Sequence, residues 1–123
     1  IPKEIGEVKR LKRLYLINNG MTGEIPVELG QLSGLMLIDL SHNHFYGTVP
    51  LSLLENPNRG VTLNYNDLTV LSWDCWLDDK YNIPSMLHNR LSGKVPENVR
   101  NTERWKDYKW LVGTQQEGYG YIE

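Results

Sequence analysis

The most reactive side chain in this chain of 123 residues is its single cysteine, Cys75. A cysteine acts as a nucleophile when a neighbouring base helps to form its thiolate. No histidine lies near Cys75 in the sequence, so we predict a buried or half-buried thiol without a catalytic role. A single cysteine also excludes a disulfide within the chain.

The three histidines, His42, His44 and His88, are the residues best suited to bind a transition metal. His42 and His88 occupy one position of a sequence repeat, the position that Asn18 and Tyr65 occupy in the other copies. Two copies of separation argue against a metal ion shared by these two residues. We predict solvated surface histidines, and we predict neither a metal site nor any other cofactor.

Three acidic residues, Asp74, Asp78 and Asp79, could bind a cation or supply a pair of carboxylates for acid–base catalysis. The segment lacks the glycine and the closing glutamate of an EF-hand loop. We predict a solvated acidic face. Since the chain shows neither a matched nucleophile and base nor a metal site, we predict that it is not an enzyme.

Four tryptophans could form an aromatic platform for sugars if their rings were exposed; they are Trp73, Trp76, Trp105 and Trp110. Aromatic rings bury a large apolar area and more often pack in a core or a cap. We therefore predict packing for this cluster, with glycan binding as the alternative.

A repeat of about 24 residues positions all of these side chains. Asparagines recur at spacings of 24, 23 and 23 residues, at Asn19, Asn43, Asn66 and Asn89. A fixed period in the twenties, with leucines at set offsets from an asparagine, indicates a solenoid of stacked copies. We expect each asparagine to bond backbone groups where a strand ends, at a cost of about 1–3 kcal/mol if it is lost.

Each copy is expected to contribute a short strand to a parallel sheet, because apolar residues alternate with variable ones. The inward residues are Leu14 and Leu16, Ile38 and Leu40, Val61 and Leu63, and Pro84 and Met86. The outward residues form a concave face, the default binding surface of a solenoid. Those suited to protein or peptide contacts are Arg13, Tyr15, Ile17, Asn18, Asp39, Ser41, His42, Thr62, Asn64, Tyr65, Ser85 and His88, and the same columns contain Leu37, Gly60, Ile83 and Leu87.

Short helical turns are expected on the opposite, convex side, over residues 27–35 and 51–58. Their inward residues are Leu29, Leu32, Leu53 and Leu54. Near the end of the chain, residues 101–110 read as a short amphipathic helix that could cover the last copy with Trp105 and Tyr108, one turn apart. The final Gly118-Tyr119-Gly120-Tyr121 segment is expected to be a loop.

The pattern Asn-x-hydrophobic-x-Gly-x-Ile-Pro-x-x-Leu-Gly-x-Leu resembles the leucine-rich repeat of plant receptor kinase ectodomains and of plant inhibitors of pectin-degrading enzymes. It covers residues 1–54 and returns over residues 86–99. This resemblance implies a leucine-rich-repeat solenoid of the α/β class. The chain departs from those plant proteins in having no glycosylation sequon and only one cysteine.

The tail, residues 105–110 and 115–121, is similar to the end of leucine-rich-repeat surface proteins of Bacteroides-type gut bacteria. That second resemblance implies an exported bacterial protein, and hence an extracellular or cell-surface location. The net charge of −2 offers no basic stripe for nucleic acid. No apolar run approaches the roughly 18 residues of a membrane span, so direct membrane insertion is not expected.

We expect one domain over residues 1–123, with repeats over 1–99 and a C-terminal cap and tail over 100–123. Because Ile1–Gly6 matches Ile25–Gly30, we expect the chain to be a fragment that starts inside a repeat. The leading functional prediction is a non-catalytic module that binds a protein or peptide on its concave face. The alternatives are glycan binding and a purely architectural end-module, and the open edge of the first strand predicts an edge-strand homodimer.

Overall fold

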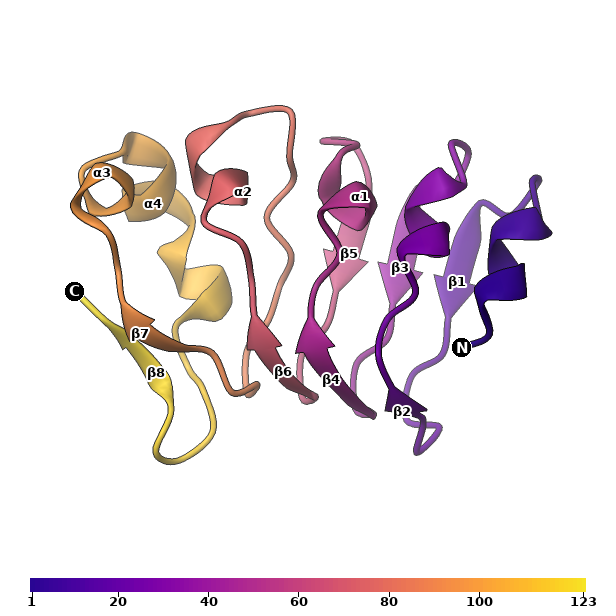
Figure 1. Ribbon diagram of the computed structural model, residues 1–123, viewed down its shortest axis with the longest axis horizontal. Helices are drawn as coiled ribbons and strands as arrows, with labels where there is room; N and C mark the ends of the chain where they lie inside the picture. Colours follow the sequence, from indigo (N-terminus) through magenta and orange to yellow (C-terminus); the bar gives the residue numbers. More distant parts are fainter.

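The copies of the repeat stack side by side in chain order along the long axis of the molecule (Figure 1). The computed structural model describes residues 1–123. Each copy places a strand on one side and a helical turn on the other, so the fold is a solenoid with short parallel sheets, as predicted.

The concave sheet contains three parallel strands, β1 (Arg13–Tyr15), β3 (Leu37–Asp39) and β5 (Gly60–Thr62), in the order β1-β3-β5. The register pairs Leu14 with Ile38 and Ile38 with Val61, which are the columns predicted from the repeat. The fourth copy adds only a bridge between Thr62 and Ser85. The pairing extends no further towards the N-terminus because Ile83 N donates to Asn82 Oδ1 at 2.9 Å, while Asn82 Nδ2 donates to the carbonyl of Arg59.

A second parallel sheet follows the asparagines, beyond the point where the sequence predicts that the concave strand ends. Its strands, in the order β2-β4-β6, are β2 (Thr22–Gly23), β4 (His44–Thr48) and β6 (Asp67–Val70). A further parallel pair joins β7 (Ser92–Lys94) to β8 (Gly120–Ile122). The end of the chain is therefore a strand, and the prediction of a loop at Gly118–Tyr121 was wrong for its second half, because β7 supplies backbone partners for residues 120–122.

Four of the helical turns begin directly after a proline, which occupies the N-cap position with extended backbone, at ψ of 147°, 137°, 129° and 147° in chain order. They are η1 (Lys3–Glu7), η2 (Val27–Gln31), α1 (Leu51–Leu54) and α3 (Glu97–Arg100). The remaining ones are α2 (Asp74–Leu77), α4 (Glu103–Tyr108) and η3 (Lys109–Val112). None of these helices has the length and apolar character needed to cross a bilayer.

The convex turns are shorter than predicted but point the expected residues inward. The turn after Pro26 ends at Gln31 because Leu32 is already extended, and the turn after Pro50 ends at Leu54. The four leucines predicted to face inward are all buried in one apolar core of 24 residues. In the first copy, Leu14 and Leu16 are only half-buried, because no other copy packs against their outer side.

The asparagine ladder links each copy to the one before it. Asn66 is 1% exposed; its Nδ2 donates to the carbonyls of Leu40 and Leu63 at 3.0 and 3.2 Å, and its Oδ1 accepts from the N–H of Phe45 at 3.0 Å. Asn43 and Asn89 bond in the same way. The predicted role of this column in satisfying backbone groups is therefore observed in the three buried copies.

Gln115 takes the next place in this ladder, which the sequence did not indicate. Its Nε2 donates to the carbonyls of Met86 and Val112 at 2.8 and 3.0 Å, and its Oε1 accepts from the N–H of Leu91 at 2.9 Å. Backbone bonds from His88 N to Thr114 O, at 2.6 Å, continue the same pattern. The hydrogen bonding of the repeats thus extends past residue 99 into the segment expected to be a cap and tail.

Two arginines on the convex side hold turns together through backbone carbonyls. Arg59 is 2% exposed and donates to the carbonyls of Leu35, Leu53 and Leu32 at 2.6, 3.2 and 2.7 Å. Burial lowers the pKa of this guanidinium. Arg104 makes similar bonds from α4 to the α2 region. From the sequence alone, an arginine is expected to be exposed at both positions.

Candidate functional site

The concave face is the side of the β1-β3-β5 sheet turned away from the core. Six of the predicted binding residues are well exposed on it: Arg13, Tyr15, Ile17, Asn18, His42 and Tyr65. Five are partly exposed: Asp39, Thr62, Asn64, Ser85 and His88. Two predictions were wrong, since Ser41 is buried and Ile83, in an outward column, is also buried.

Polar pairs in the middle of the concave face satisfy one another. Asp39 Oδ1 accepts hydrogen bonds from the backbone N–H of Ser41, at 3.0 Å, and from the Ser41 hydroxyl. This pairing explains why Ser41 is buried. Asn64 Oδ1 accepts from the Ser85 hydroxyl at 2.8 Å and from the N–H of Leu87 at 2.7 Å. These groups stabilise the sheet and have less capacity to bond a partner.

Three aromatic side chains stack at the edge of the concave face where the strands end. The ring centroids of His42 and Tyr65 lie 4.3 Å apart with planes inclined by 11°. Those of Tyr65 and His88 also lie 4.3 Å apart, inclined by 13°. We call these three residues the aromatic stack. Their ring nitrogens and hydroxyl make no hydrogen bond within the chain, so they are free to bond a partner.

The geometry of the repeat produces the stack. The residue before each ladder asparagine has a left-handed backbone, with φ of 57° at Asn18, 58° at His42, 60° at Tyr65 and 57° at His88. The side chains therefore leave the chain in the same direction in every copy. Neighbouring strands lie about 4.7–4.9 Å apart, which is close to the stacking distance of aromatic rings.

Sequence reasoning found the shared column but missed the stack. Because His42 and His88 lie two copies apart, the sequence predicts two separate solvated histidines. Tyr65 lies between them and contacts both rings. The missed signal was the succession of three planar side chains at one repeat position.

A row of charged and polar side chains lies beside the stack, one residue after each asparagine. Asp67 is 3.4 Å from His44 Nδ1 and 3.2 Å from the Arg90 guanidinium, and it accepts from Gln116 Nε2 at 3.1 Å. Arg90 Nε also donates to Gln116 Oε1 at 3.0 Å. A shallow cavity of about 270 Å³ is lined by residues of this row and of the stack. The stack and this row together present ring edges, the imidazole of His44 and the carboxylate of Asp67, whose charge is balanced by Arg90.

The tryptophan cluster is mainly packed, as predicted. Trp76 and Trp105 are buried, with ring centroids 4.9 Å apart, and Trp73 lies 4.8 Å from Tyr121. Trp110 is the exception: it is 63% exposed, so the predicted helix covers the last copy through Trp105 and not through Tyr108 or Trp110.

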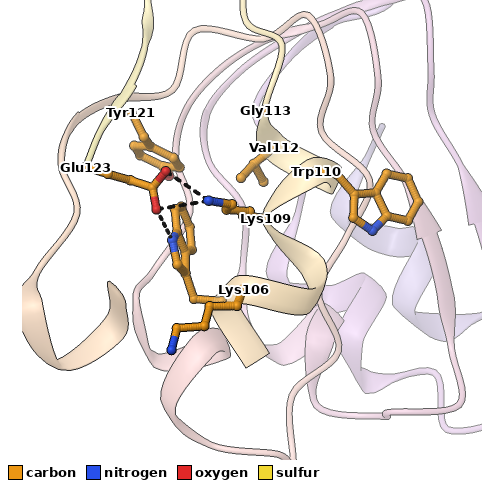
Figure 2. A pocket seen from close by; sticks show the side chains of 8 residues that line it. Lys106, Lys109, Trp110, Val112, Gly113, Tyr121 and Glu123 are labelled. Carbon is orange, nitrogen blue, oxygen red and sulfur yellow. Dashed lines mark hydrogen bonds and ion pairs between the residues drawn. The ribbon is translucent and has the colours of Figure 1, made fainter. Parts of the chain in front are cut away.

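A cavity of about 360 Å³ adjoins this cluster (Figure 2). Figure 2 shows Glu123 and Lys109 facing each other while Trp110 points away from them. Trp105 Nε1 donates to Glu123 Oε1 at 2.7 Å, and Lys109 Nζ lies 3.1 Å from Glu123 Oε2. The hydrogen bond from Trp105, followed by that from Lys109, lowers the pKa of Glu123. Trp105, Lys109 and Glu123 are thus already paired with one another, and Lys106 lies 3.6 Å from Glu103 outside the cavity.

The remaining candidates for chemistry occupy the positions expected of unreactive groups. Cys75 is buried, and its burial raises the pKa of the thiol to about 12. The thiol is therefore protonated at neutral pH. Asp74, Asp78 and Asp79 are exposed, in agreement with the predicted solvated acidic face.

Comparison with known proteins agrees with this geometry. A model of the family described as Leucine Rich Repeat matches residues 10–32. No curated protein matches the sequence of the chain. Solved structures do match it, and those described next are plant proteins.

The chain is similar to the leucine-rich-repeat ectodomain of the membrane receptor kinase GASSHO1/SCHENGEN3 from Arabidopsis thaliana, solved in complex with CASPARIAN STRIP INTEGRITY FACTOR 2. The identity is 34%, the TM-score is 0.67, and the match covers 80% of this chain and 12% of that one. It is also similar to a chain of the BIR3–SERK2 complex from Arabidopsis thaliana, at 25% identity and a TM-score of 0.63. That match covers 83% of this chain and 56% of the other chain.

A third similar structure is the plant peptide hormone receptor RGFR1 in complex with RGF2, at 25% identity and a TM-score of 0.59. That match covers 80% of this chain and 20% of the receptor. The chain thus spans between 12% and 56% of the length of these proteins. None of the comparisons supports the predicted similarity of the tail to bacterial surface proteins.

Proposed function

We propose that this leucine-rich-repeat solenoid binds a peptide or an extended segment of a protein on its concave face, and that it performs no catalysis. The observation that carries the proposal is the aromatic stack, whose polar ring atoms have no partner within the chain. Neutral histidine and tyrosine each offer a hydrogen-bond donor and an acceptor. A peptide backbone, which alternates donors and acceptors, complements such a row.

The surroundings of the stack favour the same kind of partner. Tyr15 and Ile17 are 53% and 44% exposed on the first strand and its extension. Exposed aromatic and aliphatic groups beside paired charges are typical of protein-binding surfaces. The receptors of similar structure support the proposal, since two of those described above are complexes with a peptide hormone or a named factor.

Alanine substitution of Arg13, Tyr15 and Tyr65 together tests the proposal, because all three side chains are exposed on the concave face. Peptides would first be selected on the chain from a random library displayed on phage, and their dissociation constants measured by fluorescence anisotropy. We expect the triple substitution to weaken binding by about tenfold or more, because truncating buried interface aromatics commonly costs more than ~1 kcal/mol each.

A matched control carries alanine at Val27, Asp79 and Tyr108, which are exposed away from the concave face. This variant should bind the peptides with unchanged affinity. Equal affinity of the chain and the concave-face triple variant would exclude this face as the binding surface. Failure to select any peptide, while longer natural proteins containing this module do bind, would favour the architectural end-module instead.

Glycan binding through the tryptophans is the weaker alternative. A sugar platform requires exposed ring faces, and Trp76 and Trp105 are buried. We expect no change in tryptophan fluorescence with a broad set of polysaccharides. A saturable change that is lost on substitution of Trp110 would restore the glycan hypothesis.

We further infer an extracellular or cell-surface location, which the similarity to receptor ectodomains supports. The edge-strand homodimer also remains a proposal. Strand β1 has a partner on only one side, and Leu14 and Leu16 beside it are half-buried. Light scattering would test it: a mass near twice 14.2 kDa supports the dimer, and a monomer mass at high concentration refutes it.

A further inference from the structure

The aromatic stack is open at its N-terminal end. His42 stacks on Tyr65 through one face, and no ring of the chain stacks on its other face. The next position along the stack belongs to Asn18, whose φ of 57° equals that of His88. Its backbone bond, from Asn18 N to Ser41 O at 3.1 Å, repeats the bond from His42 N to Asn64 O at 3.0 Å. Position 18 is therefore a fourth place in the stack that holds a short amide instead of a ring.

The space beside position 18 is also open. The row that contains His44, Asp67 and Arg90 in later copies has Gly20 in the first copy. A Cβ atom added at Gly20 would meet no other atom within 4 Å. In the first copy, one column thus has a short amide at Asn18 and the adjacent column has no side chain at Gly20, next to the face of His42 on which no ring of the chain stacks.

The backbone under this space is held in place. Asn43 Oδ1 accepts from the N–H groups of Asn19 and Met21 at 3.1 and 2.9 Å, and Asn43 Nδ2 donates to the carbonyl of Leu16 at 2.7 Å. A site whose shape exists before binding costs less entropy to occupy. Apolar surface is at hand as well, because Ile17 is exposed next to Asn18.

We propose that an aromatic side chain of the bound peptide stacks on the free face of His42, above Asn18, as the fourth ring of the stack. This inference rests on the proposed function, since it names the anchor residue of the partner at the same face. Geometry favours an aromatic anchor over a charged one. A ring placed one repeat spacing from His42 would lie at the same distance as the other rings of the stack, which are 4.3 Å apart. A charged group would find no counter-ion there, because Gly20 takes the position that holds His44, Asp67 and Arg90 in later copies.

Two substitutions at position 18 test the proposal. Asn18→Tyr supplies the fourth ring from the chain itself and occupies the anchor site; Tyr65, with φ of 60°, shows that this backbone accommodates a tyrosine. Asn18→Gly is the matched control, because glycine keeps a positive φ without strain and leaves the site open. Circular dichroism and urea unfolding would confirm that both variants are folded.

The probe is the set of peptides selected from the phage-displayed random library. Each peptide would be remade with its aromatic residue replaced by leucine. We expect Asn18→Tyr to weaken binding by about tenfold and Asn18→Gly by less than about threefold. The aromatic-to-leucine change should weaken binding to the unmodified chain by about tenfold and have little further effect on the Asn18→Tyr variant, because both changes remove one interaction.

Two results would overturn the inference. One is a set of peptides without an aromatic residue at a common position, and the other is an aromatic effect that adds independently to that of Asn18→Tyr. The Arg13, Tyr15 and Tyr65 triple variant separates the two failures. If it abolishes binding while position 18 shows no coupling, only the anchor assignment fails; if it binds unchanged, or if no peptide can be selected, the proposed function fails with it.

Discussion

Replacing Asn66 by alanine should destabilise the chain far more than the same change at Asn19. Both residues occupy one repeat position, but Asn66 is 1% exposed and Asn19 is exposed. The Asn19 side chain donates one hydrogen bond, to the carbonyl of Ile17 at 3.2 Å. The pair therefore compares one substitution in a buried and in a solvated copy.

The expected magnitude follows from which backbone groups lose every partner. Without Asn66 the buried N–H of Phe45 has no acceptor, at a cost of about 1–3 kcal/mol. The carbonyls of Leu40 and Leu63 lose one donor each but keep Asn43 and Asn89, so each loss costs about 0.5–1 kcal/mol. The total is about 2–5 kcal/mol, against less than ~0.5 kcal/mol at the exposed Asn19.

Urea unfolding followed by circular dichroism would measure both variants. The free energy of unfolding should fall by the amounts given above, with an unchanged dependence on urea concentration. Equal losses for the two variants would refute the reasoning. So would a loss below about 1 kcal/mol for the buried one, since the ladder would then not be satisfying backbone groups that water cannot reach.

Three further predictions concern Gln115, Arg59 and Cys75. Gln115→Ala should lower the free energy of unfolding by about 1–3 kcal/mol, because the N–H of Leu91 loses its acceptor, whereas alanine at the exposed Glu117 should leave urea unfolding unchanged. Arg59→Lys should lower the free energy of unfolding by ~2 kcal/mol or more in the same assay. The lysine ammonium lacks the planar fork of the guanidinium, so it cannot donate to the same three carbonyls. Cys75 should resist thiol reagents at neutral pH until the chain unfolds, since its pKa in the folded state is raised to about 12 from 9.0. The unfolded chain loses that proton first as the pH rises above 9.0, so stability should fall between pH 9 and 12, by up to ~1.4 kcal/mol per pH unit, and Cys75→Ala should reduce this fall.

Repeat spacing alone located the strands and the inward residues, because alternation and stacking are local and periodic. The columns of Leu14, Ile38 and Val61 pair in the expected register. The same periodicity did not predict Gln115 as a member of the ladder. Gln115 lies 26 residues after Asn89, whereas the earlier steps are 23 or 24 residues, because helix α4 and turn η3 lie between them. The longer glutamine side chain reaches the same backbone groups, and no spacing rule would have matched it to an asparagine.

Burial of polar groups was the other feature that the sequence could not predict. Arg59 is buried because three carbonyls from two neighbouring turns converge on its guanidinium. Ser41 is buried because Asp39, two residues earlier, accepts its hydroxyl. Both outcomes depend on where separate backbone segments meet, which hydrophobic patterning does not specify.

By itself, the sequence determined the period, the inward leucines, the asparagine column and the side of the sheet that faces outward. Only the tertiary structure decided that His42, Tyr65 and His88 form one continuous stack, and that it stops at Asn18 with a free ring face. The physical reason is that an apolar pattern sets which way a side chain points. Ring contact requires in addition that neighbouring copies share one left-handed turn and lie one strand spacing apart.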